Sequence, residues 1–222
     1  MTYARDYTNI IDAAEHFDAD QFIQFVEQKH PNLDEQDGQG NTALMIAVQQ
    51  DKQDILEYLI HSGANLDIQN RKKRTALMQA VIDLNTKAAL TLIQAGADIH
   101  LRDKDNRTVL SFVASTIQIM RTVENASGRS GIVDAYRKIM YYFVAVGADI
   151  DDLTETQKAQ NKEIIDKALI EKQRRGKQSV YEAYNAQVAD MTQVLSDIST
   201  QKTEQARRQK RPLPFTKRRR KI

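Results

Sequence analysis

The chain of 222 residues contains no cysteine and no tryptophan, and 41% of it is hydrophobic but only 6% aromatic. The lack of cysteine excludes disulfide bonds, a thiolate nucleophile and thiolate-bound zinc, and the composition favours a core of thin layers of small aliphatic side chains. The net charge of +2 hides a division, because nine of the 32 lysines and arginines fall within residues 207–222, which hold no acidic residue. The other 23 stand against 30 acidic residues, so an acidic body of about −7 precedes a basic tail.

The N-terminal segment does not have the pattern of an export signal. Residues 1–17 carry Asp6, Asp12 and Glu15 and lack a continuous apolar run, unlike a secretory leader. No stretch of the sequence approaches the about 18 consecutive apolar residues that a membrane-spanning helix needs. We therefore expect a cytoplasmic protein with no membrane partner.

Residues 9–34 fit a pattern that becomes clearer further along the chain. Three apolar residues, Ala14, Phe22 and Val26, each precede another apolar residue by 33 positions, namely Ala47, Ile55 and Leu59. We predict a diverged N-terminal cap over residues 1–34. Its outer face is expected to be polar, because an end repeat has water on one side.

The segment from Asn41 to Asp67 recurs after 33 residues as Arg74 to His100. Each copy begins with two short predicted helices, which cover about 42–50 and 53–61 in the first copy, and each ends at a glycine that can close a helix in the left-handed conformation. Such a period is typical of stacked repeats. We predict repeats over 35–67 and 68–100. The matching positions include Thr42 and Thr75, and Gly63 and Gly96. The side chains expected in the core are Leu44, Ala47, Leu59, Leu77, Ala80 and Leu92.

A third repeat is predicted over residues 101–151, but it is longer than the others. It starts on schedule at Thr108, whereas its closing glycine, Gly147, comes 51 residues after Gly96 instead of 33. The extra residues fall near 117–133, and the sequence SGRSG at 127–131 predicts a flexible loop that projects from the stack, with the second helix resuming over about 134–145. Long loops of this kind are either functional contacts or tolerated insertions, and both interpretations stay open.

Beyond residue 152 the period stops, and residues 153–206 predict a helical extension. Two capping boxes, at 154–157 and 179–182, predict helices over about 155–174 and 180–206. The second helix has one apolar stripe, formed by Val180, Tyr184, Val188, Met191, Leu195 and Ile198. This stripe predicts docking on the last repeat, self-association as a homodimer through residues 180–198, or ordering on a partner.

The repeats resemble those of the ankyrin family, whose signature is T-P-L-H-x-A followed by a second helix and G-A-D. The corresponding residues here are TALMIA at 42–47, TALMQA at 75–80, and the triplets at 63–65 and 96–98, without the proline and histidine of the signature. The resemblance implies an all-α helical solenoid, here followed by a helical extension and a disordered basic tail. It also implies a non-enzymatic protein-binding module, an adaptor or inhibitor. Small proteins of this kind are often bacterial, where neutralising a toxin or acting as an effector in a host cell are two candidate roles.

No catalytic pattern is present in the sequence. The histidines His16, His30, His61 and His100 stand singly, and the glycine-rich phosphate loops and the G-x-S-x-G elbow are missing. We expect no enzyme activity, no cofactor and no metal site.

The turns between ankyrin-like repeats project as fingers beside the inner helices. The first turn is acidic, the second (residues 70–74) is basic, and the third (102–107) is mixed and net basic, so a protein partner with an acidic surface is expected. Ile82 and Phe112 are either apolar anchors for that partner or core residues. The candidate protein-binding residues are Arg71, Lys72, Lys73, Gln79, Ile82, Arg102, Lys104 and Phe112.

An alternative function follows from the tail. Its nine cations would bind nucleic acid through phosphate contacts, and the run at 217–221 also resembles a nuclear-import signal, which would place the protein in a nucleus. The candidate residues are Arg207, Arg208, Lys210, Arg211, Lys217, Arg218, Arg219, Arg220 and Lys221.

Overall fold

The computed structural model describes residues 9–127 and 131–174. The predicted helix over 180–206, its apolar stripe and the basic tail at 207–222 lie outside the described residues. The elements are α1 (Ile10–His16), α2 (Ala19–Lys29), α3 (Ala43–Gln49), α4 (Gln53–His61), α5 (Ala76–Ile82), α6 (Thr86–Gln94), α7 (Val109–Ser127), α8 (Gly131–Val146), the 3-10 helix η1 (Ile150–Asp152) and α9 (Glu155–Gln160). Residues 162–174 are also helical.

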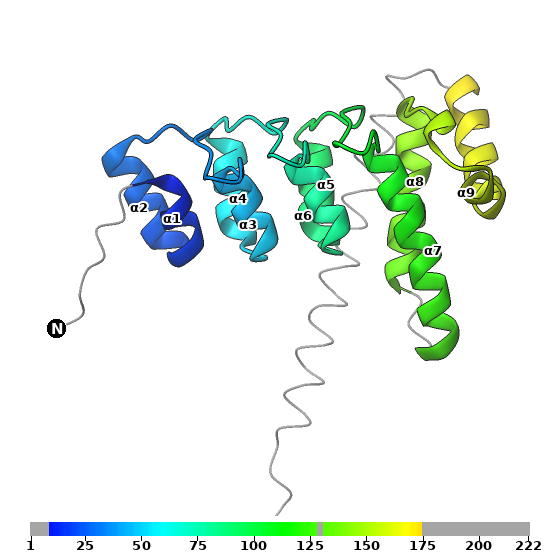
Figure 1. The fold of residues 1–222 in the computed structure, drawn as a ribbon, viewed down its shortest axis with the longest axis horizontal. Helices are drawn as coiled ribbons and strands as arrows, with labels where there is room; N and C mark the ends of the chain where they lie inside the picture. Colours follow the sequence, from blue (N-terminus) through cyan, green and yellow to red (C-terminus); the bar gives the residue numbers. More distant parts are fainter. Residues whose placement is uncertain (1–8, 128–130, 175–222) are drawn as a thin grey trace, which may run out of the picture.

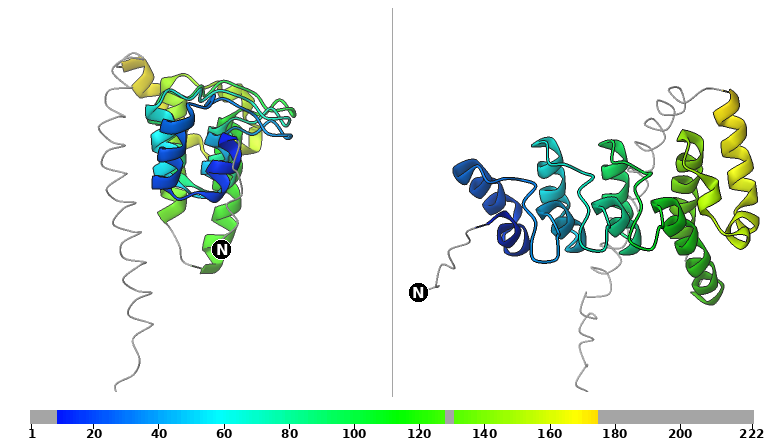
Figure 2. Two further views of the ribbon diagram at one scale, coloured as in Figure 1. Left: turned by 90° about the vertical axis from the view of Figure 1, so that its left-hand side faces the viewer. Right: turned by 45° about the horizontal axis from the view of Figure 1, so that its top comes forward.

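The helices form two layers that run along the stack. Each of α1, α3, α5 and α7 lies beside the next of this set, and α2, α4, α6 and α8 form the second layer in the same order (Figures 1 and 2). The turns that connect successive pairs lie together along one edge of the stack. The described residues contain no strand, so the predicted all-α solenoid is confirmed.

The repeated threonines explain where the inner helices begin. The hydroxyl of Thr42 accepts a hydrogen bond from the amide of Met45, and Thr75 caps α5 through Met78 in the same way. These bonds satisfy amide groups that lack partners at a helix start. The residues predicted for the core are confirmed, because Leu44, Ala47, Leu59, Leu77, Ala80 and Leu92 are each at most 1% exposed.

We call residues 36–42, 69–75 and 102–108 the first, second and third fingers. Isolated β-bridges between residues 36 and 42 and between 102 and 108 close the first and third. Hydrogen bonds between residues 33 positions apart, which we call the finger ladder, join all three fingers. Gln36 Nε2 donates to the carbonyl of Gln69, and Gln69 Nε2 donates to the carbonyl of Arg102. At the end of the ladder, Arg102 Nη2 donates instead to Asp152 in η1, so η1 stands where a further finger would begin.

The insertion at 117–133 corrects a prediction. Residues up to Ser127 continue α7 without a break, and α8 already begins at Gly131, so most of the insertion is helical and the expected long loop is wrong. The added turns of α7 extend beyond the ends of the other inner helices (Figure 1). The helix continues because its apolar residues keep helical spacing: Ile117 is fully buried in the core, and Met120 packs against the core.

The predicted helix over 155–174 is interrupted at Asn161. The capping box of Thr154 and Gln157 starts α9 as expected. Asn161 then leaves the helical conformation, and its side-chain amide donates to the carbonyl of Gln157. Gln157 in turn donates to Ser115 on α7, so α9 packs against the last inner helix. At the break, the carbonyl of Asn161 accepts the amides of Ile164 and Ile165, so the next helix begins there.

Gly40 permits the close approach of the first two fingers. Its φ is +80°, and a Cβ there would lie 3.0 Å from the amide nitrogen of Arg71 and 3.1 Å from the Cα of Asn70. Gly63 has a similar φ of +84°, but nothing lies within 4 Å of its Cβ position.

Gly40→Ala and Gly63→Ala should each lower the free energy of unfolding by about 1–2 kcal/mol, because alanine is strained in the left-handed conformation. Gly40→Ala should lower the free energy of unfolding by about 1–2 kcal/mol more through overpacking, because the added Cβ clashes with backbone atoms. Urea unfolding of the two variants measures the difference. Equal losses would show that the fingers separate at no cost.

Candidate functional site

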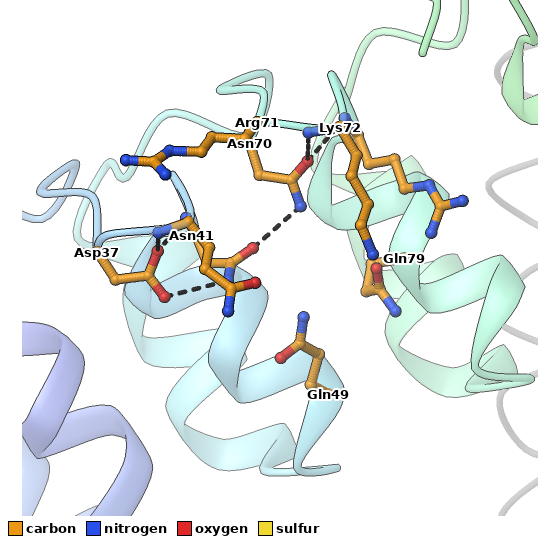
Figure 3. Close-up of a pocket in the computed structure, with 9 residues that line it drawn as sticks. Asp37, Asn41, Gln49, Asn70, Arg71, Lys72 and Gln79 are labelled. Carbon is orange, nitrogen blue, oxygen red and sulfur yellow. Dashed lines mark hydrogen bonds between the residues drawn. The ribbon is translucent and has the colours of Figure 1, made fainter. Parts of the chain in front are cut away.

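A pocket of about 600 Å³ lies between the first and second fingers and reaches down to the inner helices α3 and α5. Figure 3 shows its polar lining. Three of the lining side chains are cations and only one is a carboxylate. The lining residues are Asp37, Gln39, Asn41, Gln49, Asn70, Arg71, Lys72, Arg74 and Gln79.

Asp37 and Asn70 hold the two fingers in shape. The Asp37 carboxylate accepts bonds from the amide nitrogens of Gln39 (2.7 Å) and Asn41 (2.8 Å) and from the Asn41 side chain (3.1 Å). Burial raises the pKa of Asp37, but these hydrogen bonds to the ionised form outweigh it and hold the pKa below its ordinary value. Asn70 Oδ1 accepts from the amides of Lys72 and Arg74, and Asn70 Nδ2 donates to Asn41 Oδ1 at 3.0 Å, which links the fingers.

The cations of the second finger are available for contact. Arg71, Lys72 and Lys73 are exposed, and no carboxylate of the described residues forms an ion pair with them or with Arg74. In Figure 3 the Arg71 side chain extends towards the first finger, whereas Lys72 extends towards Gln79 on α5. The pocket therefore has a net positive charge, which comes from the second finger.

Arg74 is held more firmly than the other two pocket cations. Its guanidinium carbon lies 5.8 Å from the centre of the Phe112 ring, and Arg107 lies 4.8 Å from the same centre, so both cations face this ring. Arg74 Nε is buried and has no hydrogen-bond partner among the described residues.

The third finger differs, because its arginines are already paired. Arg102 forms an ion pair with Asp152 at 2.6 Å, and Arg107 forms ion pairs with Asp103 and Asp105, each at 2.7 Å. Burial raises the pKa of Asp103, but its hydrogen bonds with Arg107 hold the pKa below the ordinary value. Lys104 is exposed and forms no ion pair with a described residue. Most of the positive charge of this finger is thus neutralised within the chain.

A family model described as "Ankyrin repeats (3 copies)" matches residues 10–116. The match covers all three fingers, the pocket and the stacked helices from α1 to the first turns of α7. Residues 10–116 are therefore ankyrin repeats. No curated protein matches it significantly. The match to the family begins at Ile10, so it includes most of the segment predicted as a diverged cap together with the repeats that follow.

The ankyrin fold brings together only part of the predicted binding set. Arg71, Lys72 and Gln79 line the pocket, while Lys73 lies exposed at the finger tip. Ile82 is half-buried at the end of α5. Phe112 is half-buried, packs against the core and is the ring beneath Arg74 and Arg107. Arg102 serves the end of the finger ladder, and Lys104 lies outside the pocket.

Sequence reasoning missed the polar frame of the pocket. Asp37, Asn70 and Asp103 recur at intervals of 33, and each accepts backbone amides two and four residues further on. Asp and Asn commonly stabilise turns in this way. A search of the period for polar as well as apolar residues would have found them.

The described residues offer no other site of obvious chemistry. No group of histidine, aspartate and glutamate side chains within 9–127 and 131–174 has a geometry that holds a metal ion. None of the helices described is both long and apolar enough to cross a membrane. The nucleic-acid candidates of the tail lie beyond the described part of the chain.

Proposed function

We propose that this ankyrin-repeat protein is a non-enzymatic adaptor or inhibitor that binds a protein with an acidic surface. Ankyrin repeats generally mediate protein–protein interaction. The observation that carries the finer proposal is the run Arg71, Lys72, Lys73 and Arg74, whose charges no described carboxylate pairs. Charges of one sign on a binding face steer a partner of opposite sign and favour it over others.

The contact set consists of the second finger and the inner helices beside it. Arg71, Lys72 and Lys73 supply charge, and Gln79 presents a polar side chain from α5 within the same pocket. We assign Arg102 a structural role, because its ion pair with Asp152 already uses its charge. Lys104 and Phe112 lie at the margin of this contact set, and Phe112 acts by holding Arg74 in place.

The test is capture of the partner by the full chain, followed by a dissociation constant for the purified pair. Reversal of the finger charges by Arg71→Glu, Lys72→Glu and Lys73→Glu together should weaken binding by about tenfold or more. The matched control reverses Lys29, Lys87 and Lys138, which are exposed on the second-layer helices α2, α6 and α8. Equal affinity of the two triple variants would refute binding through the second finger.

The tail offers the alternative function. Its nine cations would support association with nucleic acid, or delivery of an effector to a host nucleus, with the repeats as a partner platform. A chain that ends at Ala206 separates the two proposals. It should keep the protein partner if the repeats bind it. It should lose all salt-sensitive association with DNA or RNA if the tail is responsible.

A further inference from the structure

We infer that the pocket between the first and second fingers binds the carboxylate side chains of an extended acidic peptide segment. This inference rests on the proposed protein-binding function and names the chemistry of the partner at that site. The pocket has a volume of about 600 Å³ and is lined by polar side chains of the two fingers, α3 and α5. Its opening between two fingers suits a segment that lies across the stack.

The hydrogen-bond acceptors of the pocket frame are already in use. The single carboxylate, Asp37, accepts three hydrogen bonds from its own finger. Asn70 Oδ1 accepts two backbone amides, and Asn41 Oδ1 accepts the Asn70 side chain. Asp37 forms no ion pair with the pocket cations among the described residues, and its one negative charge stands against the three positive charges of Arg71, Lys72 and Arg74.

The free groups of the pocket are mainly donors. Arg71, Lys72 and Arg74 carry the charge, and the side chains of Gln39 and Gln49 form no hydrogen bond with any described residue. Arginine and lysine donate charge-assisted hydrogen bonds to carboxylates, and a guanidinium can do so with two parallel bonds. An anionic ligand would pair with the three cations, whereas a cationic ligand would be repelled by them and an apolar ligand would not pair with them.

The spread of the cations favours several carboxylates over one phosphate. Arg71 extends towards the first finger and Lys72 towards α5, so their charged groups diverge (Figure 3). A single phosphate group is bound best by donors that converge on one point. Divergent cations match a chain that carries successive glutamate or aspartate side chains.

The experiment uses the full chain and a synthetic octaglutamate peptide. Because the nine cations of residues 207–222 also attract this peptide, the readout must be local, and hydrogen–deuterium exchange of the backbone amides in 36–41 and 69–79 provides it. The peptide should slow exchange there by about threefold or more in the wild-type chain. The slowing should be absent from Arg71→Glu/Lys72→Glu and retained in the matched control Lys29→Glu/Lys87→Glu.

A second pair of variants leaves the fingers intact. Gln49→Glu places a carboxylate in the pocket, whereas Gln50→Glu adds the same charge at the neighbouring exposed position outside it. Gln49→Glu should weaken the peptide effect by about fivefold and Gln50→Glu by less than about twofold. Equal effects of the two, or slowing by a singly phosphorylated serine peptide that exceeds the effect of octaglutamate, would overturn the inference. If octaglutamate fails while the captured partner is still lost by the finger triple variant, the proposed function stands and only this ligand assignment falls.

Discussion

Replacing Leu77 by alanine should lower the free energy of unfolding by about 2–5 kcal/mol. Leu77 is 0% exposed on α5, and α5 packs against both α3 and α7 in the inner layer. Truncation removes apolar contacts on both sides and leaves a cavity that the short helices cannot close. The loss is large relative to the whole, because small domains are stable by only about 5–15 kcal/mol.

Urea unfolding followed by far-ultraviolet circular dichroism measures this loss. Leu84→Ala is the matched control. It also replaces a leucine by alanine, but Leu84 is 37% exposed in the turn after α5. The control should change stability by less than about 1 kcal/mol. In a stack where each repeat contacts only its neighbours, Leu77→Ala should also broaden the transition by weakening the contact between the two halves. Equal losses from Leu77→Ala and Leu84→Ala would contradict the packing described for α5.

The stacked helices were predictable because every repeat solves the same packing problem. Thr42, Leu44 and Ala47 recur at Thr75, Leu77 and Ala80, since each inner helix needs a cap and a small, apolar side facing the next one. The bounds of α4 came directly from this pattern. Because each repeat needs the same cap and the same apolar contacts, these residues recur at a fixed interval and can be found in the sequence.

The errors arose where the period gives no guidance. The glycines and serines of 127–131 indicated a flexible centre for the insertion, yet α7 has 19 residues where α5 has 7. Ile117 is buried in the core and Met120 packs against the core, and these apolar residues continue the helical spacing of α7. If the helical spacing of the apolar residues had been given more weight than the glycines and serines, the longer helices would have been predicted.

The candidate site was half predictable for a similar reason. The charge of the second finger is plain from residues 71–74, but the neutralisation of the third finger depends on the pair of Arg102 and Asp152, which lie 50 positions apart. Local charge therefore identified the cations without showing which remain unpaired. The fold decides that Arg71 and Lys72 are available and that Arg102 is not.

Replacing Lys52 by methionine should detach the first helix pair from the stack and cost about 1–3 kcal/mol. Lys52 Nζ donates to the carbonyls of Ala14 (2.8 Å), Glu15 (2.7 Å) and Phe17 (3.0 Å), at and just beyond the C-terminal end of α1. A cation is favoured at this end of a helix, where unpaired carbonyls concentrate partial negative charge. Desolvation lowers the pKa of Lys52 and outweighs the opposite effect of Glu15 and Asp18, so the ammonium group is partly withdrawn from water.

Methionine keeps the length of the lysine side chain but donates no hydrogen bond, so the carbonyls of α1 lose a shared partner. Hydrogen exchange should therefore quicken in α1 and α2 well before it does in α5, which has α3 and α7 on its two sides. Lys87→Met, at an exposed position of α6, is the control and should leave both exchange and stability unchanged. If Lys52→Met behaves like this control, the three carbonyls are satisfied by water and the N-terminal pair is held by its apolar contacts alone. If the predicted loss is found, a single partly buried ammonium group helps to join the first helix pair to the repeats that carry the binding pocket.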